Sequence, residues 1–197
     1  MFNPIAQINR GLDFSKNFDF LAPLAIRLYM LPILYVGARA KIHGFDGVVQ
    51  WFSSSPADGG LGLPMPYLMA ILATGTEALG FVCIALGLFT RVISVPLIIV
   101  MIVAALSVHW SHGWAAIAGK TTEAGMRMEG LMAWLAQEFP GRFNYVTEFG
   151  DPVALNNGIE FTATYTIMFL VLFFFGGGRF VSLDYWLAKI WPNSWPK

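Results

Sequence analysis

Four stretches of almost unbroken apolar residues dominate this sequence, and each is about as long as a bilayer is thick. They cover residues 20–38, 66–88, 92–108 and 157–175. The hydrocarbon core of a membrane is about 30 Å thick, so a helix that crosses it needs about 20 such residues. We therefore expect an all-α integral membrane protein, a four-transmembrane-helix bundle that forms a single membrane domain over residues 1–197.

The composition excludes most soluble classes of protein. Charged residues make up 12% of the chain and hydrophobic residues 56%, whereas a soluble domain carries about 25% charged residues. Twelve Lys and Arg balance twelve Asp and Glu, which excludes a basic surface for nucleic acid. The single cysteine, Cys83, excludes an internal disulfide and cysteine-rich metal sites; we interpret it as a small apolar residue.

The connection between the third and fourth predicted spans, residues 109–156, is too long for a structureless loop without a role. Residues 123–139 predict an amphipathic helix within it. Its apolar face would carry Ala124, Met128, Leu131, Leu135 and Phe139. Such a helix is suited to the membrane surface, so we expect an interfacial helix in the long outer loop.

The orientation follows from the Lys and Arg residues near the span ends, which favour the cytoplasm. With four spans both termini share one side. That side carries Arg10, Lys16, Arg91, Arg179, Lys189 and Lys197, and the other carries Arg39, Lys41, Lys120, Arg127 and Arg142. The modest excess predicts cytoplasmic termini in a bacterial inner (cytoplasmic) membrane protein.

Two charged residues lie well inside the apolar stretches, Arg27 in the first and Glu77 in the second. A charge in the bilayer costs about 2.5–3.5 kcal/mol on insertion scales. One interpretation is a buried Arg27–Glu77 ion pair that stabilises the bundle. The other is an intramembrane polar site, formed by the same two residues, for a quinone head group or a proton relay.

A second set of polar residues flanks the outer ends of the predicted spans. We expect Lys41, His43, His109, His112 and Glu160 to form an outer polar cluster, and the three histidines are candidate metal ligands. Nearby methionines could add thioether ligands suited to Cu(I), namely Met65, Met69, Met126 and Met128. The alternative is that the histidines bond to backbone carbonyls at the interface and that no metal is held firmly.

Several short motifs, taken in order, resemble one family of small membrane proteins. They are GARAKI at residues 37–42, GTEALG at 75–80 and LGLFTR at 86–91. This pattern resembles the DoxX family. Further segments resemble its HvfX-type branch: WF at 51–52, GLGLP at 60–64, VHW at 108–110, LNNGIEF at 155–161 and GGGRFVSLDYW at 176–186.

The resemblance implies a role in a membrane complex but assigns no catalytic residues. The HvfX-type branch is associated with maturation of copper-binding modified peptides, which implies an accessory or partner subunit that handles such a peptide. Other relatives are quinone-linked oxidoreductase subunits, which implies the alternative of a membrane redox subunit. A small transporter ranks lowest, because four helices enclose a pore only as an oligomer. Catalytic activity, the cofactor (quinone or copper) and the oligomeric state stay open.

Overall fold

The computed structural model describes residues 12–192 and Trp195. Within these residues the chain is helical, with a single isolated β-bridge, between Ile117 and Leu155. The chain divides into two compact units. The first comprises the described parts of Met1–Ile102 and Tyr165–Lys197, and the second is Val103–Thr164. The prediction of a single membrane domain therefore stays a prediction.

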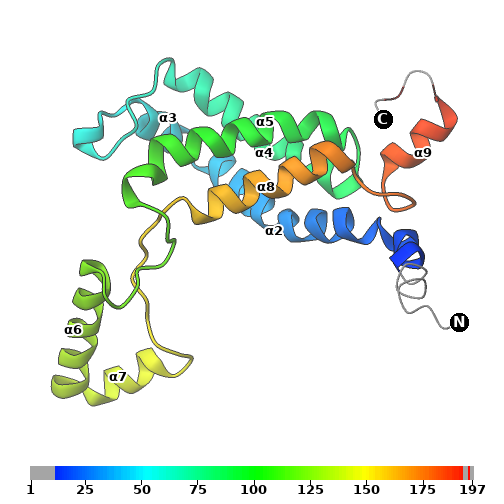
Figure 1. Ribbon diagram of the computed structural model, residues 1–197. Helices are drawn as coiled ribbons and strands as arrows, with labels where there is room; N and C mark the ends of the chain where they lie inside the picture. Colours follow the sequence, from blue (N-terminus) through cyan, green and yellow to red (C-terminus); the bar gives the residue numbers. More distant parts are fainter. Residues whose placement is uncertain (1–11, 193–194, 196–197) are drawn as a thin grey trace, which may run out of the picture. The chain divides into compact units, whose positions relative to one another are not determined.

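The first unit contains the long apolar helices. Its elements are α2 (Leu21–His43), α3 (Phe45–Ser53), α4 (Pro66–Leu86), α5 (Thr90–Ala104), most of α8 (Glu160–Phe175) and α9 (Leu183–Ile190) (Figure 1). Helices α2 and α4 lie side by side and antiparallel, because Arg27 near the start of α2 contacts Ile84 near the end of α4. The connection between the first two predicted spans contains α3, which packs against α4.

The core of this unit is shared by four helices. It consists of Met30 and Leu34 from α2, Ile84 from α4, Leu97 from α5, and Phe169 and Leu172 from α8. Gly80 allows α4 to approach α5 closely, since a Cβ there would lie 2.8 Å from a methyl group of Leu97. Gly80 thus serves helix packing, as small residues do between helices in lipid.

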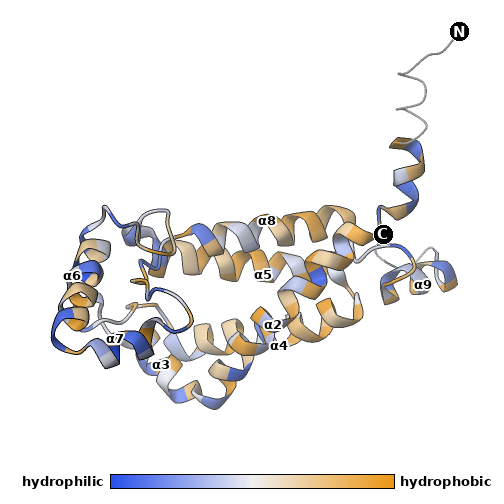
Figure 2. Ribbon diagram, turned by 90° about the horizontal axis from the view of Figure 1, so that it is seen from below, coloured by the Kyte–Doolittle hydropathy of each residue, from blue (hydrophilic) through white to orange (hydrophobic). Residues whose placement is uncertain are grey.

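The outward faces of these helices are apolar (Figure 2). Val36, Leu79, Ile99 and Phe174 are each more than half exposed. In water such a surface would be unfavourable, whereas in a bilayer it faces acyl chains of similar polarity. By length and composition three helical segments can cross a membrane: Leu21–His43, Pro66–Leu86 and Thr90–His112. The sequence boundaries of these three spans were right to within five residues.

The fourth predicted span is shorter than expected. Helix α8 starts at Glu160 instead of residue 157, because Asn157 has a left-handed backbone with φ of 62°. Its 16 residues reach about 24 Å at 1.5 Å per residue, which is less than the bilayer core. A four-span bundle is therefore not established by helix length.

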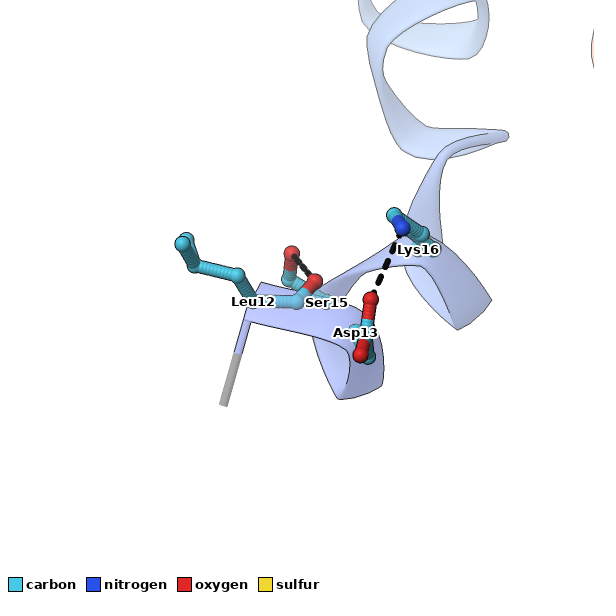
Figure 3. Close-up of polar contacts among 4 residues, drawn as sticks. All are labelled: Leu12, Asp13, Ser15 and Lys16. Carbon is cyan, nitrogen blue, oxygen red and sulfur yellow. Dashed lines mark hydrogen bonds and ion pairs between the residues drawn. The ribbon is translucent and has the colours of Figure 1, made fainter. Parts of the chain in front are cut away.

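The third span continues past α5 in a different helical form. Residues Ala105–His109 are π-helical, and Trp110–His112 form one 3₁₀ turn. Before α2, Lys16 pairs with Asp13 at 2.7 Å and the Ser15 hydroxyl donates to Leu12 O (Figure 3). Arg10 and Lys197, which the orientation argument used, lie outside the described residues.

The second unit is built around the expected amphipathic helix. Helix α6 (Glu123–Glu138) matches the prediction for residues 123–139. It begins at Thr122, whose hydroxyl accepts from Gly125 N at 3.2 Å, and it packs against α7 (Pro140–Thr147), which the sequence did not predict (Figure 1). Two of the residues expected on its apolar face, Leu131 and Phe139, are about half exposed.

Candidate functional site

The buried carboxylate of Glu77 pairs with Lys41. Lys41 Nζ lies 2.9 Å from Glu77 Oε1 and 2.7 Å from Oε2. The Glu77 side chain is 8% exposed and that of Lys41 is 27% exposed. One ammonium group therefore neutralises both carboxylate oxygens inside the α2–α4 helix pair, close to the C-terminal end of α2.

Gly37 makes this pairing sterically possible. It lies one turn before Lys41 on α2, and helical side chains lean toward the preceding turn. A Cβ at position 37 would lie 2.8 Å from Glu77 Oε2. The glycine thus leaves room for the carboxylate, and the lysine stem passes over that gap. These three residues belong to the two motifs GARAKI and GTEALG, and the fold brings the motifs together.

The expected Arg27–Glu77 ion pair is wrong. The Arg27 guanidinium binds four backbone carbonyls: Nε donates to Ile84 O at 2.8 Å, Nη2 to Ala85 O at 2.9 Å, and Nη1 to Gly177 O and Val181 O at 2.9 Å each. In the antiparallel pair Arg27 faces the end of α4, whereas Glu77 lies about two turns further in. The two side chains therefore serve different neighbours.

The carbonyls that Arg27 binds are at a helix end, where they lack intrahelical partners. Helix α4 ends at Gly87, which has φ of 62° and whose Cβ would lie 2.8 Å from Arg27 Cζ. Only a residue without a Cβ permits both this backbone and this close approach. Arg27, which is 4% exposed, therefore ties the end of α4 to the segment that follows α8.

Asp184 supports the same end of the bundle, and the sequence reasoning did not single it out. Its carboxylate accepts from Phe89 N at 2.7 Å and Thr90 N at 2.8 Å, at the start of α5. An acid at a helix N-terminus is stabilised by the unpaired N–H groups and the helix dipole. The available sequence signal was its place in the SLDYW segment, where Ser182 caps α9 by accepting from Tyr185 N.

One buried hydroxyl on α4 lacks a partner. Thr74, one turn before Glu77 and on the same buried face of the helix, is 8% exposed, and its Oγ1 has no hydrogen-bond partner among the described residues. Buried polar atoms are usually satisfied. A small polar ligand beside the Lys41–Glu77 pair would find both charge and a hydroxyl on the same helix face.

In the second unit, the predicted site residues bind a stretch of backbone in which two chain segments pair. Residues 113–118 run beside residues 154–160 through backbone bonds such as Ala118 N to Ala154 O at 2.9 Å. His109 Nδ1 donates to Asn157 O at 2.8 Å, and Glu160 Oε2 accepts from Ala116 N at 2.9 Å. Both predicted residues therefore bind this paired backbone. Asn156 adds bonds to His112 O and Ala115 O, at 2.7 Å each.

The other two histidines also bind carbonyls. His43 Nδ1 is 2.9 Å from Arg39 O, and His112 Nδ1 is 3.2 Å from Val108 O. Within the described ranges no group of three or more His, Cys, Asp or Glu side chains is placed to hold a metal ion. Because Lys41 and His43 belong to one unit and His109, His112 and Glu160 to the other, the five-residue outer polar cluster stays a prediction.

The second unit also carries a hollow that opens on the α6–α7 hairpin. Its volume is about 360 Å³, and residues from α6, α7 and 151–154 line it. Met128, Met132, Ala133 and Phe143 contribute apolar surface, and Glu129 adds charge. Large apolar side chains stand exposed on the same hairpin, including Trp134 and Tyr145.

Comparison with known proteins places residues 22–110 within the model of the DoxX family. The chain is 36% identical over 104 residues to the inner membrane protein YphA of Escherichia coli (strain K12), an alignment that covers 50% of this chain and 69% of that protein. No solved structure matches significantly. The family match includes Gly37, Lys41 and Glu77 and ends before the α6–α7 hairpin.

Proposed function

Because this chain belongs to the DoxX family, we propose that it is an accessory subunit of a complex in the bacterial inner membrane and that its α6–α7 hairpin binds the partner. The observation that carries this proposal is the position of the hairpin. It lies outside the family-matched residues 22–110, and it carries a hollow together with exposed aromatic residues. We expect the element that binds a particular partner to lie outside the residues that match the family model.

The partner we propose is a copper-binding peptide during its maturation, as the HvfX-type motifs imply. The thioethers of Met128 and Met132 in the hollow suit a soft metal carried by such a peptide. The aromatic residues of the hairpin suit the apolar anchors of a peptide. In this proposal the peptide carries the copper, because the histidines of the chain bind backbone carbonyls.

A photo-crosslinking amino acid at Ala133 tests this function, because Ala133 is exposed and lines the hollow. We expect ultraviolet light to attach a small cysteine- or methionine-containing peptide in cells of the source organism. The matched control is the same amino acid at Leu79, an exposed position on α4, which should capture lipid alone. Identical products from both positions would contradict the proposal.

The proposal also requires that the hairpin lie outside the cytoplasm. This follows if α8 completes a fourth span and both termini are cytoplasmic, with α6 lying along the outer membrane surface. A C-terminal alkaline phosphatase fusion should then be inactive and a fusion after residue 150 active. An active C-terminal fusion would overturn this topology.

A quinone-linked redox subunit is the second candidate, and the Thr74 hydroxyl favours it. A quinone head group needs a few polar groups in an apolar site, and two candidate spans supply them: Thr74 and Glu77 from one and Lys41 from the other. Ubiquinone-8 added to the detergent-purified protein should then be retained in native mass spectrometry. Glu77→Gln should keep the fold and reduce that retention, whereas equal retention would exclude this site.

A further inference from the structure

A second hollow lies at the opposite end of the first unit from Lys41. It has a volume of about 200 Å³ and is enclosed by the start of α5, the glycine-rich segment after α8, and α9. Its lining includes Phe89, Arg91, Val92, Phe175, Arg179 and Tyr185. All of these residues belong to the first unit, so the hollow does not depend on the α6–α7 hairpin or on the proposed partner.

The hollow lies at the start of one candidate span. Arg91 is the second residue of the candidate span Thr90–His112, and Arg179 follows the end of α8 by four residues. Arginines at span ends reach the interface, where phospholipid phosphates are concentrated. The ligand within reach of this hollow is therefore the lipid that surrounds it.

Two guanidinium groups supply the charge. Arg91 Nη2 donates to Phe174 O at 2.8 Å, which holds its guanidinium beside the end of α8. Arg179 pairs with Asp19 at 2.8 Å, and these side chains are 45% and 57% exposed. An exposed pair of this kind contributes at most about 1 kcal/mol to stability. A phosphate can therefore bind Arg179 beside the Asp19 carboxylate or in its place.

The acid in the lining does not offset these arginines. Asp184 accepts hydrogen bonds from Phe89 N, Thr90 N and Trp195 Nε1, and the N-terminus of α5 compensates its charge. A choline or ethanolamine cation would therefore find no available carboxylate here. This charge distribution favours a headgroup with a net negative charge over a zwitterionic one.

The remaining lining is suited to acyl chains. Val92 is 54% exposed and Phe175 is 71% exposed, and both stand on helices whose outward faces are apolar. A lipid whose phosphate contacts the arginines can run its chains along these two side chains. Tyr185, which contacts Phe180 edge to face and has Lys189 Nζ 4.4 Å from its ring centroid, adds an aromatic ring to the lining.

We propose that this hollow binds the headgroup of an anionic phospholipid, with the phosphate between Arg91 and Arg179 and the acyl chains along Val92 and Phe175. The chemistry recognised is a phosphodiester. A glycerol headgroup adds hydroxyls that can bond to the backbone of the glycine-rich segment, Gly176 to Gly178.

The test uses the full chain in mild detergent, titrated with phosphatidylglycerol, phosphatidylcholine or inorganic phosphate and measured by native mass spectrometry. Both lipids carry a phosphodiester, but phosphatidylcholine also carries a cation that the two arginines repel, and it lacks the glycerol hydroxyls. We therefore expect phosphatidylglycerol to be retained at least about tenfold more than phosphatidylcholine, because like charges brought together disfavour binding. Inorganic phosphate should not displace it. Equal retention of the two lipids would overturn the proposal, and displacement by phosphate would show that the site binds a free anion instead of a lipid.

The double substitution Arg91→Gln and Arg179→Gln should abolish this preference, whereas replacing both by lysine should retain most of it. Arg39→Gln is the matched control, since Arg39 is an exposed arginine of α2 that binds Tyr35. If the glutamine variant fails to fold, Ala188→Phe fills the hollow and keeps both arginines. Wild-type retention of phosphatidylglycerol by Ala188→Phe would contradict the site.

Discussion

Arg27 and Glu77 are both buried charges of the α2–α4 helix pair, yet they are neutralised in different ways. Arg27 binds four neutral carbonyls from two chain segments. Glu77 binds one flexible ammonium, that of Lys41, which lies about 21 Å along α2 from Arg27 at 1.5 Å per residue. A cation among fixed carbonyls has one stable arrangement, whereas a carboxylate with a mobile counter-ion can exchange that partner for a ligand or a proton. Arg27 therefore stabilises the structure, and we propose that Glu77 is the residue free to take part in ligand binding or proton exchange.

The largest effect is expected from Arg27→Met. The substitution keeps an apolar stem but leaves the carbonyls of Ile84, Ala85, Gly177 and Val181 without their donor. Each buried, unsatisfied group costs about 1–3 kcal/mol, and partial relaxation reduces the sum, so we expect the free energy of unfolding to fall by about 3–5 kcal/mol. Unfolding by sodium dodecyl sulfate in mixed micelles, followed by circular dichroism, measures it. A loss below about 1 kcal/mol would remove the structural role.

Glu77→Leu should cost less, about 2 kcal/mol, because Lys41 is left without a counter-ion but is partly exposed and can turn to the interface. The double variant Lys41→Met, Glu77→Leu should recover most of that loss. A double-mutant cycle in the same unfolding assay isolates the coupling. Additive losses would mean that the pair seen here does not stabilise the protein.

Gly37→Ala tests the space that the ion pair needs. The new Cβ would meet Glu77 Oε2 at 2.8 Å, and we expect a loss of about 1–2 kcal/mol, as for overpacking. Gly75→Ala on α4 is the matched control, because nothing lies within 4 Å of its Cβ position. Alanine there should be neutral or raise stability through helix propensity. Equal effects at both glycines would show that the close approach is unimportant.

The smallest effect is expected from Asp184→Asn, which keeps an acceptor at the start of α5 but removes its charge. Loss of the interaction with the helix dipole should lower stability by about 0.5–1 kcal/mol. Asp13→Asn, in an exposed pair with Lys16, should change it by less. The difference should shrink as salt is added, and a salt-independent loss would point to geometry instead.

The sequence predicted the long helices well because each is specified locally, by an apolar run of span length. It also predicted α6, whose periodicity is local too. The sequence did not predict side-chain partners that depend on the register between helices far apart in the chain. Arg27 was assigned to Glu77 because both are charged and buried, but the antiparallel packing of α2 on α4 places Arg27 beside residues 84–85. The partner of Arg27 can be identified only when the register of α2 on α4 is known.

The partners of the other polar residues were missed for the same reason. Lys41 and Glu77 were both named as candidates, yet they were placed in different sites because Lys41 was grouped with the polar residues at the outer ends of the predicted spans. The lysine side chain instead extends back one turn over Gly37. The sequence signal for this arrangement was a glycine four residues before the lysine, which leaves room for the lysine side chain to extend back along the helix. For Asp184 the acid was visible, but its partners at Phe89 and Thr90 lie about 95 residues earlier, beyond any local pattern.

The contacts of Arg27 also set an order of events during synthesis. Its α4 partners are 57 and 58 residues downstream, whereas Gly177 and Val181 are 150 and 154 residues downstream. At about 5–20 residues per second, the guanidinium enters the membrane roughly 8–30 s before its last carbonyls leave the ribosome. We expect ribosome-bound chains that stop short of residue 177 to be cut faster by protease near α2 than complete ones. Until residues 177–181 have been made, Arg27 in α2 therefore lacks two of its four carbonyl partners.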